Sequence, residues 1–195
     1  SNGCFSSFNL SYDVGDDPES VRRNLLTLNS ILPSNPYWLN QIHENIALEL
    51  PCDKNLLNAD ASYTMQNKVV CAVRTADCLP ILLTNVNGDF VAAIHAGWRS
   101  LASGIIENTL NKINSKSEII AWLGPSIGEY YYEVGKQVFD VFTQNDPESK
   151  YGFKKLPSNK YLLNLPKIAL AKLRNKGITQ LFGAGVDELF CTYRD

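Results

Sequence analysis

The sequence contains little histidine and methionine and has no long apolar run. Among its 195 residues are two histidines and one methionine. Multicopper oxidases need many imidazole ligands, so two histidines exclude a multicopper site within this one chain. No apolar stretch approaches the roughly 20 residues that span a bilayer, and no secretory signal is visible in the first residues. We therefore expect a cytoplasmic protein with no membrane partner.

Cysteine pairs and excess positive charge are also missing. The five cysteines are irregularly spaced and form no CxxC pair, so we do not expect a disulfide framework. This cysteine usage predicts a reduced cytoplasmic protein instead. Lys and Arg number 18 against 20 Asp and Glu, a net charge of −2, which excludes the basic footprint of a nucleic-acid-binding protein. With 45% hydrophobic residues, the composition is that of a globular chain, and we expect one domain over residues 1–195.

Strand-like and helix-like stretches alternate along the chain, which predicts an α/β or α+β fold. The Asn87-Gly88 dipeptide lies between two apolar runs and predicts a hairpin. Helices are expected from Asp17-Pro18 to before Pro33, and over 101–113, 134–142 and 166–176. Strands are expected over 37–43, 68–75, 79–84, 90–94 and 119–123 and near Leu181.

Three side chains form a candidate metal site. His43 and His95 each lie at the predicted end of a strand, and Cys78 lies in a short link between two strands. Two imidazoles and a thiolate suit zinc, and three protein ligands leave a fourth position open, as in catalytic zinc sites. The spacing matches no local zinc-finger pattern, so an alternative stays open in which Cys78 is a small core residue and both histidines bond to backbone carbonyls.

The residues around these ligands add to the case. Asp77 places a carboxylate directly before Cys78, and Gly97 and Arg99 closely follow His95. Glycine allows a ligand to approach the backbone, and the guanidinium of arginine suits phosphate or carboxylate. The Gly124–Gly128 loop matches no phosphate-loop pattern, and a plain turn is the favoured interpretation.

Five motifs together resemble one protein family: NQIH at 40–43, TADCLPIL at 75–82, HAGWR at 95–99, LGPSIG at 123–128 and YEVG at 132–135. SFNL at 7–10, VGDDP at 14–18 and Cys191-Thr192 fit the same pattern. The chain is similar to the laccase-domain family, variously named polyphenol oxidase, purine nucleoside phosphorylase and peptidoglycan editing factor. Relatives usually carry Gly where this chain has Glu44 and Ser100.

The resemblance implies a sandwich of mixed β-sheets flanked by helices, related in fold to cysteine hydrolases. It places the family's zinc ligands on His43, Cys78 and His95. It implies cleavage of adenosine, inosine or methylthioadenosine by phosphate, with deamination of adenosine, and it makes Asn9 and Gln41 substrate contacts. The expected partners are nucleosides and phosphate, and we expect a monomer or weak homodimer.

In phosphorolysis, Arg99 is our candidate for binding phosphate, with Arg74 as a substitute. Asp77 is our candidate for acid–base chemistry or for orienting a metal ligand. In deamination, zinc would lower the pKa of bound water toward about 7. The HxE…PCxxC signature of zinc deaminases is absent.

Three other functions remain open. Cys78 and His95 could act as nucleophile and base of a hydrolase or of an enzyme that edits cell-wall precursors. A single copper held by two His and Cys would make a polyphenol oxidase, although Met65 has no recognisable place as an axial ligand. The zinc could also stabilise a non-catalytic binding module.

Overall fold

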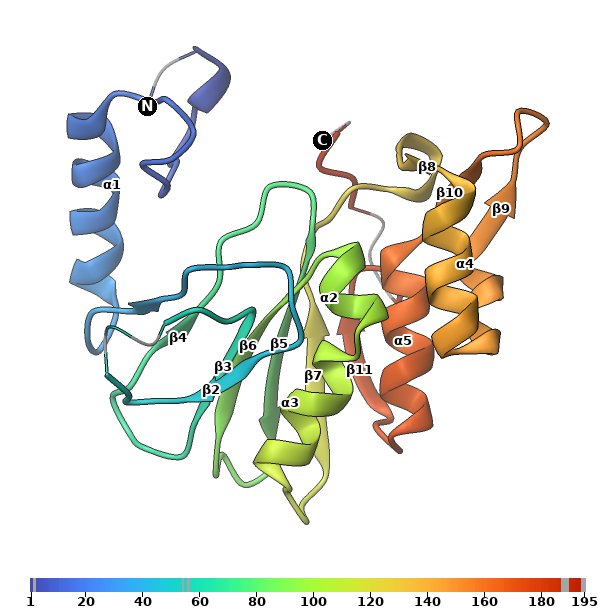
Figure 1. The fold of residues 1–195 in the computed structure, drawn as a ribbon. Helices are drawn as coiled ribbons and strands as arrows, with labels where there is room; N and C mark the ends of the chain where they lie inside the picture. The colour runs from blue at the N-terminus through green and yellow to red at the C-terminus, as the bar shows by residue number, and fades with distance from the viewer. Residues whose placement is uncertain (2, 54, 56, 187–189, 194–195) are drawn as a thin grey trace.

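A mixed six-stranded sheet forms the centre of the fold (Figure 1). The structure is a computed structural model, and it describes residues 1, 3–53, 55, 57–186 and 190–193. The strand order is β11-β7-β5-β6-β3-β2, with β11–β7 and β3–β2 parallel and the other three pairs antiparallel. The strands are β2 (Ala47–Glu49), β3 (Ala61–Thr64), β5 (Leu79–Asn85), β6 (Val91–Ala96), β7 (Ile119–Leu123) and β11 (Gln180–Gly183).

Helices pack on one face of this sheet, as Figure 1 shows for α2, α3 and α5. In β5, Leu79, Ile81 and Leu83 are buried in the core beneath them, whereas Leu82 on the opposite face is 45% exposed. This alternation is that of a sheet covered on one side. The helices are α1 (Pro18–Ile31), α2 (Trp98–Ala102), α3 (Ile105–Ile113), α4 (Lys136–Asn145) and α5 (Leu165–Asn175).

Two small sheets flank the central one. β1 (Tyr37–Trp38) pairs in parallel with β4 (Cys71–Ala72). β10 (Tyr161–Leu163) pairs antiparallel with both β8 (Glu133–Val134) and β9 (Phe153–Lys155). Short 3-10 helices span Gly3–Phe5, Glu129–Tyr131 and Pro147–Gly152. The prediction of mixed sheets flanked by helices is therefore confirmed.

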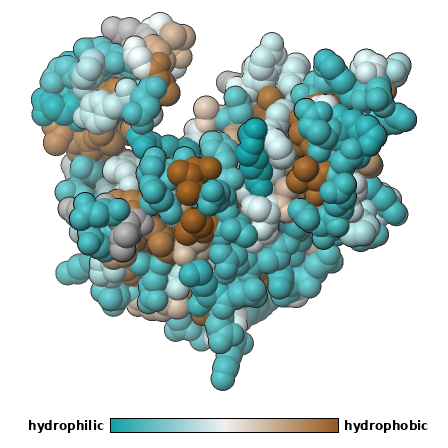
Figure 2. All heavy atoms as spheres, in the orientation of Figure 1, coloured by the Kyte–Doolittle hydropathy of each residue, from teal (hydrophilic) through white to brown (hydrophobic). Residues whose placement is uncertain are grey.

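The N-terminal residues and α1 form a lobe that stands apart from the sheet, and the space-filling surface is hollowed beside it (Figure 2). Arg74 connects this lobe to the body. Its guanidinium reaches Ser11 Oγ at 3.5 Å and Asp13 at 3.9 Å and lies over the Trp38 ring. The lobe is thus held by contacts that start in the loop between β4 and β5.

Several predicted elements are shorter than expected. The predicted strand 37–43 keeps only β1, and 68–75 keeps only β4, which pairs with β1 and not with β5. Cys78 lies between two strands, β4 and β5, as predicted, but the two strands belong to different sheets. The physical reason lies at Arg74, whose backbone N–H donates to the Gln41 side chain instead of to a strand partner.

The predicted helix 101–113 is divided in two. Gly104 adopts φ +89°, which ends α2 and precedes α3. The hairpin at Asn87-Gly88, α1, α4, α5, β7 and β11 are confirmed within a few residues. None of the helices in the described part of the chain is long and apolar enough to cross a membrane.

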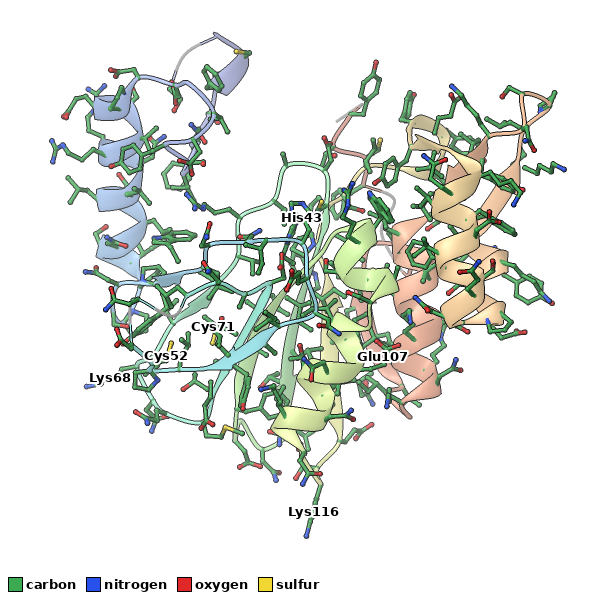
Figure 3. The ribbon with its side chains drawn as sticks, viewed as in Figure 1. His43, Cys52, Lys68, Cys71, Glu107 and Lys116 are labelled. Atoms are coloured by element: carbon green, nitrogen blue, oxygen red, sulfur yellow. The ribbon has the colours of Figure 1, made fainter. Side chains whose placement is uncertain are left out.

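A half-buried ion pair joins α3 to α5. Lys172 Nζ lies 2.7 Å from Glu107 Oε1, with the two side chains 7% and 29% exposed, and Figure 3 shows Glu107 on α3. Glu107 Oε2 is buried and has no hydrogen-bond partner among the described residues.

We predict that Lys172→Met lowers the free energy of unfolding by about 1–3 kcal/mol, because it leaves a partly buried carboxylate without its cation. Adding Glu107→Leu should recover most of the loss, since an apolar pair carries no desolvation penalty. Urea denaturation followed by circular dichroism measures both. Equal stability of wild type and Lys172→Met would contradict the prediction.

Candidate functional site

The structure brings His43, Cys78 and His95 together at the upper end of the sheet. Their ligand atoms all lie within 4.8 Å of one another, and the two imidazole rings meet edge to face with centroids 4.8 Å apart. Figure 3 shows where His43 lies above the strands. Cys78 directly precedes β5, and His95 is the penultimate residue of β6. Residues far apart in sequence thus form one group that could hold a metal ion.

The strand register explains how two of the ligands meet. Pro80 of β5 pairs with His95 of β6, so Cys78 lies at the end of the neighbouring strand. His95 alternates with Ile94, which belongs to the core under the helices. Because successive side chains of a strand point to opposite faces, His95 lies on the face away from α2 and α3.

A buried carboxylate fixes His95. Asp60 is 0% exposed, and its Oδ1 lies 2.7 Å from His95 Nδ1. An ionised carboxylate can only accept a hydrogen bond, so Nδ1 carries a proton, and Nε2 is the ring nitrogen left for a metal once its own proton is released. That arrangement orients an imidazole for a metal or a proton transfer.

The same carboxylate also fixes the backbone around His43. Asp60 Oδ2 accepts hydrogen bonds from the N–H groups of Ile42 at 3.2 Å and Glu44 at 2.8 Å. Between them His43 adopts φ +60°, a left-handed conformation that costs a non-glycine residue roughly 1–2 kcal/mol. His43 therefore lies in a tight loop. The prediction that it lies at the end of a strand is wrong.

Gly97 forms one wall of the ligand group. A Cβ at this position would lie 3.0 Å from Cys78 Sγ, 3.2 Å from His43 Cδ2 and 3.6 Å from His95 Nε2. Its φ of −66° is ordinary, so the lack of a side chain matters here for space and not for backbone conformation. The space beside Gly97 is where the three donor side chains converge.

Burial and neighbouring charges set the protonation of the group. Burial favours neutral His95, but the hydrogen bonds to Asp60 and Cys78 outweigh it and raise the pKa of His95 to about 9. Burial, followed by the charge of His95, lowers the pKa of His43. Burial opposes the charge of Asp60, yet its bonds from His95 and the adjoining backbone hold its pKa below the usual value.

Asp77, Arg99 and Tyr132 surround Cys78. Burial raises the pKa of Tyr132 to about 12; the charges of Cys78 and Asp77 raise it as well, and Arg99 opposes them. Arg99 is exposed, and its guanidinium lies 4.4 Å from the centre of the Trp98 ring. Asp77 is also exposed. A cation and a carboxylate are therefore both present in the neighbourhood of the candidate metal ligands.

The predicted substrate contacts lie on the side of the N-terminal lobe. Gln41 exchanges two hydrogen bonds of 2.8 Å with the Arg74 backbone, which ties the His43 loop to the segment that precedes Cys78. Asn9 bonds to Ser11 and Asp16 within the N-terminal segment. A substrate role for Asn9, Gln41 and Arg74 stays a prediction.

A cavity of about 210 Å³ lies on the other flank of the site. Its wall includes Ile127, Tyr131, Phe190 and Cys191. The Ile127 N–H donates to the Asp77 carbonyl at 2.9 Å, so the cavity wall is directly bonded to the residue before Cys78.

Sequence reasoning missed Asp60, which bonds to the His95 ring and to the backbone on both sides of His43. The available signal was a single carboxylate between Ala59 and Ala61, in a run of small and aromatic residues without other charges. Such a charge is rarely buried unless it is paired. Tyr132 was noted only as part of a motif and received no role.

Comparisons with known proteins find relatives along nearly the whole chain. The chain is 42% identical to a purine nucleoside phosphorylase of Haemophilus influenzae over 98% of this chain and 79% of the relative. It is 40% identical to the purine nucleoside phosphorylase YfiH of Escherichia coli over 98% of this chain and 78% of the relative.

Solved structures show the same fold. A crystal structure of a Neisseria meningitidis protein has a TM-score of 0.87 and 38% identity, covering 98% of this chain and 78% of that one. The crystal structure of YlmD from Geobacillus stearothermophilus has a TM-score of 0.82 and 26% identity, covering 98% of this chain and 77% of that one. The family described as multi-copper polyphenol oxidoreductase laccase matches residues 1–195, and the chain belongs to this family.

Proposed function

We propose that this chain is a zinc-dependent purine nucleoside phosphorylase that cleaves adenosine, inosine and methylthioadenosine and also deaminates adenosine. The observation that carries the proposal is the convergence of His43, Cys78 and His95 within 4.8 Å, with Asp60 behind His95. The names of the relatives that are 42% and 40% identical supply the substrate class.

The donor set suits zinc. Two imidazoles and one thiolate are common zinc ligands, and Gly97 leaves room beside all three. His95 is held with Nε2 available, as a metal-ligating histidine requires. When bound, the metal would supply Lewis-acid chemistry.

A multicopper centre does not suit these residues. The chain has two histidines and one methionine, and Met65 follows β3 at the end that pairs with Val91, away from the His95 end of β6. Copper at the single His-Cys-His group remains an outcome that metal analysis distinguishes.

The side chains around the ligands would handle the substrate. The exposed guanidinium of Arg99 would bind phosphate, which a planar fork of N–H donors fits. The Asp77 carboxylate would exchange a proton with the base at Oδ2, since its Oδ1 is occupied by the Thr192 hydroxyl. Asn9, Gln41 and Arg74 would contact the nucleoside from the N-terminal side.

A Cys–His hydrolase is the second candidate, including one acting on cell-wall precursors. The order Cys78, His95, Asp60 is that of a nucleophile, a base and an orienting carboxylate. This candidate gives no role to His43, whose ring also lies against His95. The third donor is why we favour the metal enzyme.

The first test measures metal content and phosphate-dependent base release from adenosine, inosine and methylthioadenosine. We expect about one zinc per chain in the wild type. Both zinc and base release should be lost in Cys78→Ala and kept in Cys71→Ala, a matched half-buried cysteine. A metal-free wild type whose Cys78 alkylates readily would favour the hydrolase, and one copper per chain would favour the oxidase.

A second prediction concerns Asp60. Asp60→Asn should weaken zinc binding about 10- to 100-fold, because one amide cannot accept from both His95 and the loop backbone. Competition with a chromogenic chelator measures the affinity. Glu44→Gln is the control, since it removes an exposed negative charge from the same loop. Equal affinities in Asp60→Asn and Glu44→Gln would refute this role.

A third prediction concerns Gly97. Gly97→Ala should reduce zinc content, because the added methyl group would lie 3.0 Å from Cys78 Sγ. The apo protein should keep its melting temperature within a few degrees, since the backbone at this position is unstrained. Full zinc occupancy in Gly97→Ala would show that the ligands converge elsewhere.

A further inference from the structure

The segment 190–193 is docked against the loop that follows β7. The Thr192 N–H donates to the Ser126 carbonyl at 3.1 Å, and the Gly128 N–H donates to Cys191 Sγ at 3.3 Å. The Tyr193 ring stacks on Tyr131 with centroids 4.8 Å apart. None of these contacts uses the Thr192 side chain.

The Thr192 hydroxyl reaches the candidate site instead. Its Oγ1 donates a hydrogen bond of 2.7 Å to Asp77 Oδ1, across 115 residues of sequence. The Asp77 backbone is held separately, because its carbonyl accepts from the Ile127 N–H. The hydroxyl therefore acts on the carboxylate and selects one rotamer of an exposed side chain, and no other hydrogen bond to this carboxylate is made by the described residues.

The side chain held in this way lies close to the candidate metal site. Asp77 directly precedes Cys78, so its carboxylate belongs to the residue next to a candidate metal ligand. An exposed carboxylate with no partner would spread over several rotamers, and catalytic groups lose efficiency when their geometry is loose.

We propose that Thr192 is a positioning residue whose hydroxyl holds the Asp77 carboxylate in place for proton exchange with the substrate. This inference rests on the proposed nucleoside reaction and on the role of Asp77 in it. It adds a residue from the far end of the chain to the site formed by the loops near β5 and β6.

The test is a double-mutant cycle on nucleoside turnover. Thr192→Val keeps the shape and removes the hydroxyl, and Thr192→Ser keeps the hydroxyl. We expect Thr192→Val to lower kcat about fivefold, as for the loss of one ordinary hydrogen bond, with KM and zinc content unchanged. Thr192→Ser should stay within about twofold of wild type. In an Asp77→Asn background, Thr192→Val should have almost no further effect.

The outcomes separate this inference from the proposed function. An active wild type with unchanged kcat in Thr192→Val, or a fivefold loss that persists in the Asp77→Asn background, overturns the positioning role alone. Unchanged turnover in Asp77→Asn overturns the role of Asp77 and the positioning role with it. A wild type that releases no base from any nucleoside overturns the proposed function and this inference together.

Discussion

The buried carboxylate of Asp60 is the constraint on which the site depends. One oxygen fixes the imidazole of His95, and the other holds the backbone on both sides of His43. A fully buried charge is costly unless it is paired, so Asp60 and the two histidines must form as one unit. The mutual arrangement of the histidines is therefore set by folding.

The arrangement of Asp60, His95 and Cys78 would suit either a cysteine hydrolase or a metal enzyme. His43, the third donor, distinguishes the two. Asp60 would orient His95 as a base next to the thiol of Cys78, as in a cysteine hydrolase. His43 adds a second imidazole within reach of the same point, held in a left-handed conformation that costs free energy. A loop strained to place a histidine there is more readily explained by a ligand site than by a two-residue nucleophile.

The sequence predicted more of the site than of the sheet. Residue chemistry and the family motifs predicted His43, Cys78 and His95 as one group, although their spacing matches no local zinc pattern, and the chain has just two histidines. β3 was missed, although it pairs with β6 in the centre of the sheet, because Ala61–Thr64 is short and buried at every position and so shows no alternation. Asp60 was missed with it. Its importance comes from contacts with residues 16 and 35 positions away, which no local pattern records.

Hydrogen bonds that do not use the His43 imidazole hold the loop that carries this residue. Gln41 bonds to the Arg74 backbone, Asn45 donates to the Ser103 carbonyl, and Asp60 takes the N–H groups between them. His95 is fixed by β6, on which it lies, and Cys78 by β5, which begins at the next residue. A site so prepared loses little conformational entropy when it binds a metal or a substrate, so most of the binding free energy is available for affinity. Polar contacts thus hold the loop that carries His43, while the apolar core beneath α2, α3 and α5 supplies the stability of the fold.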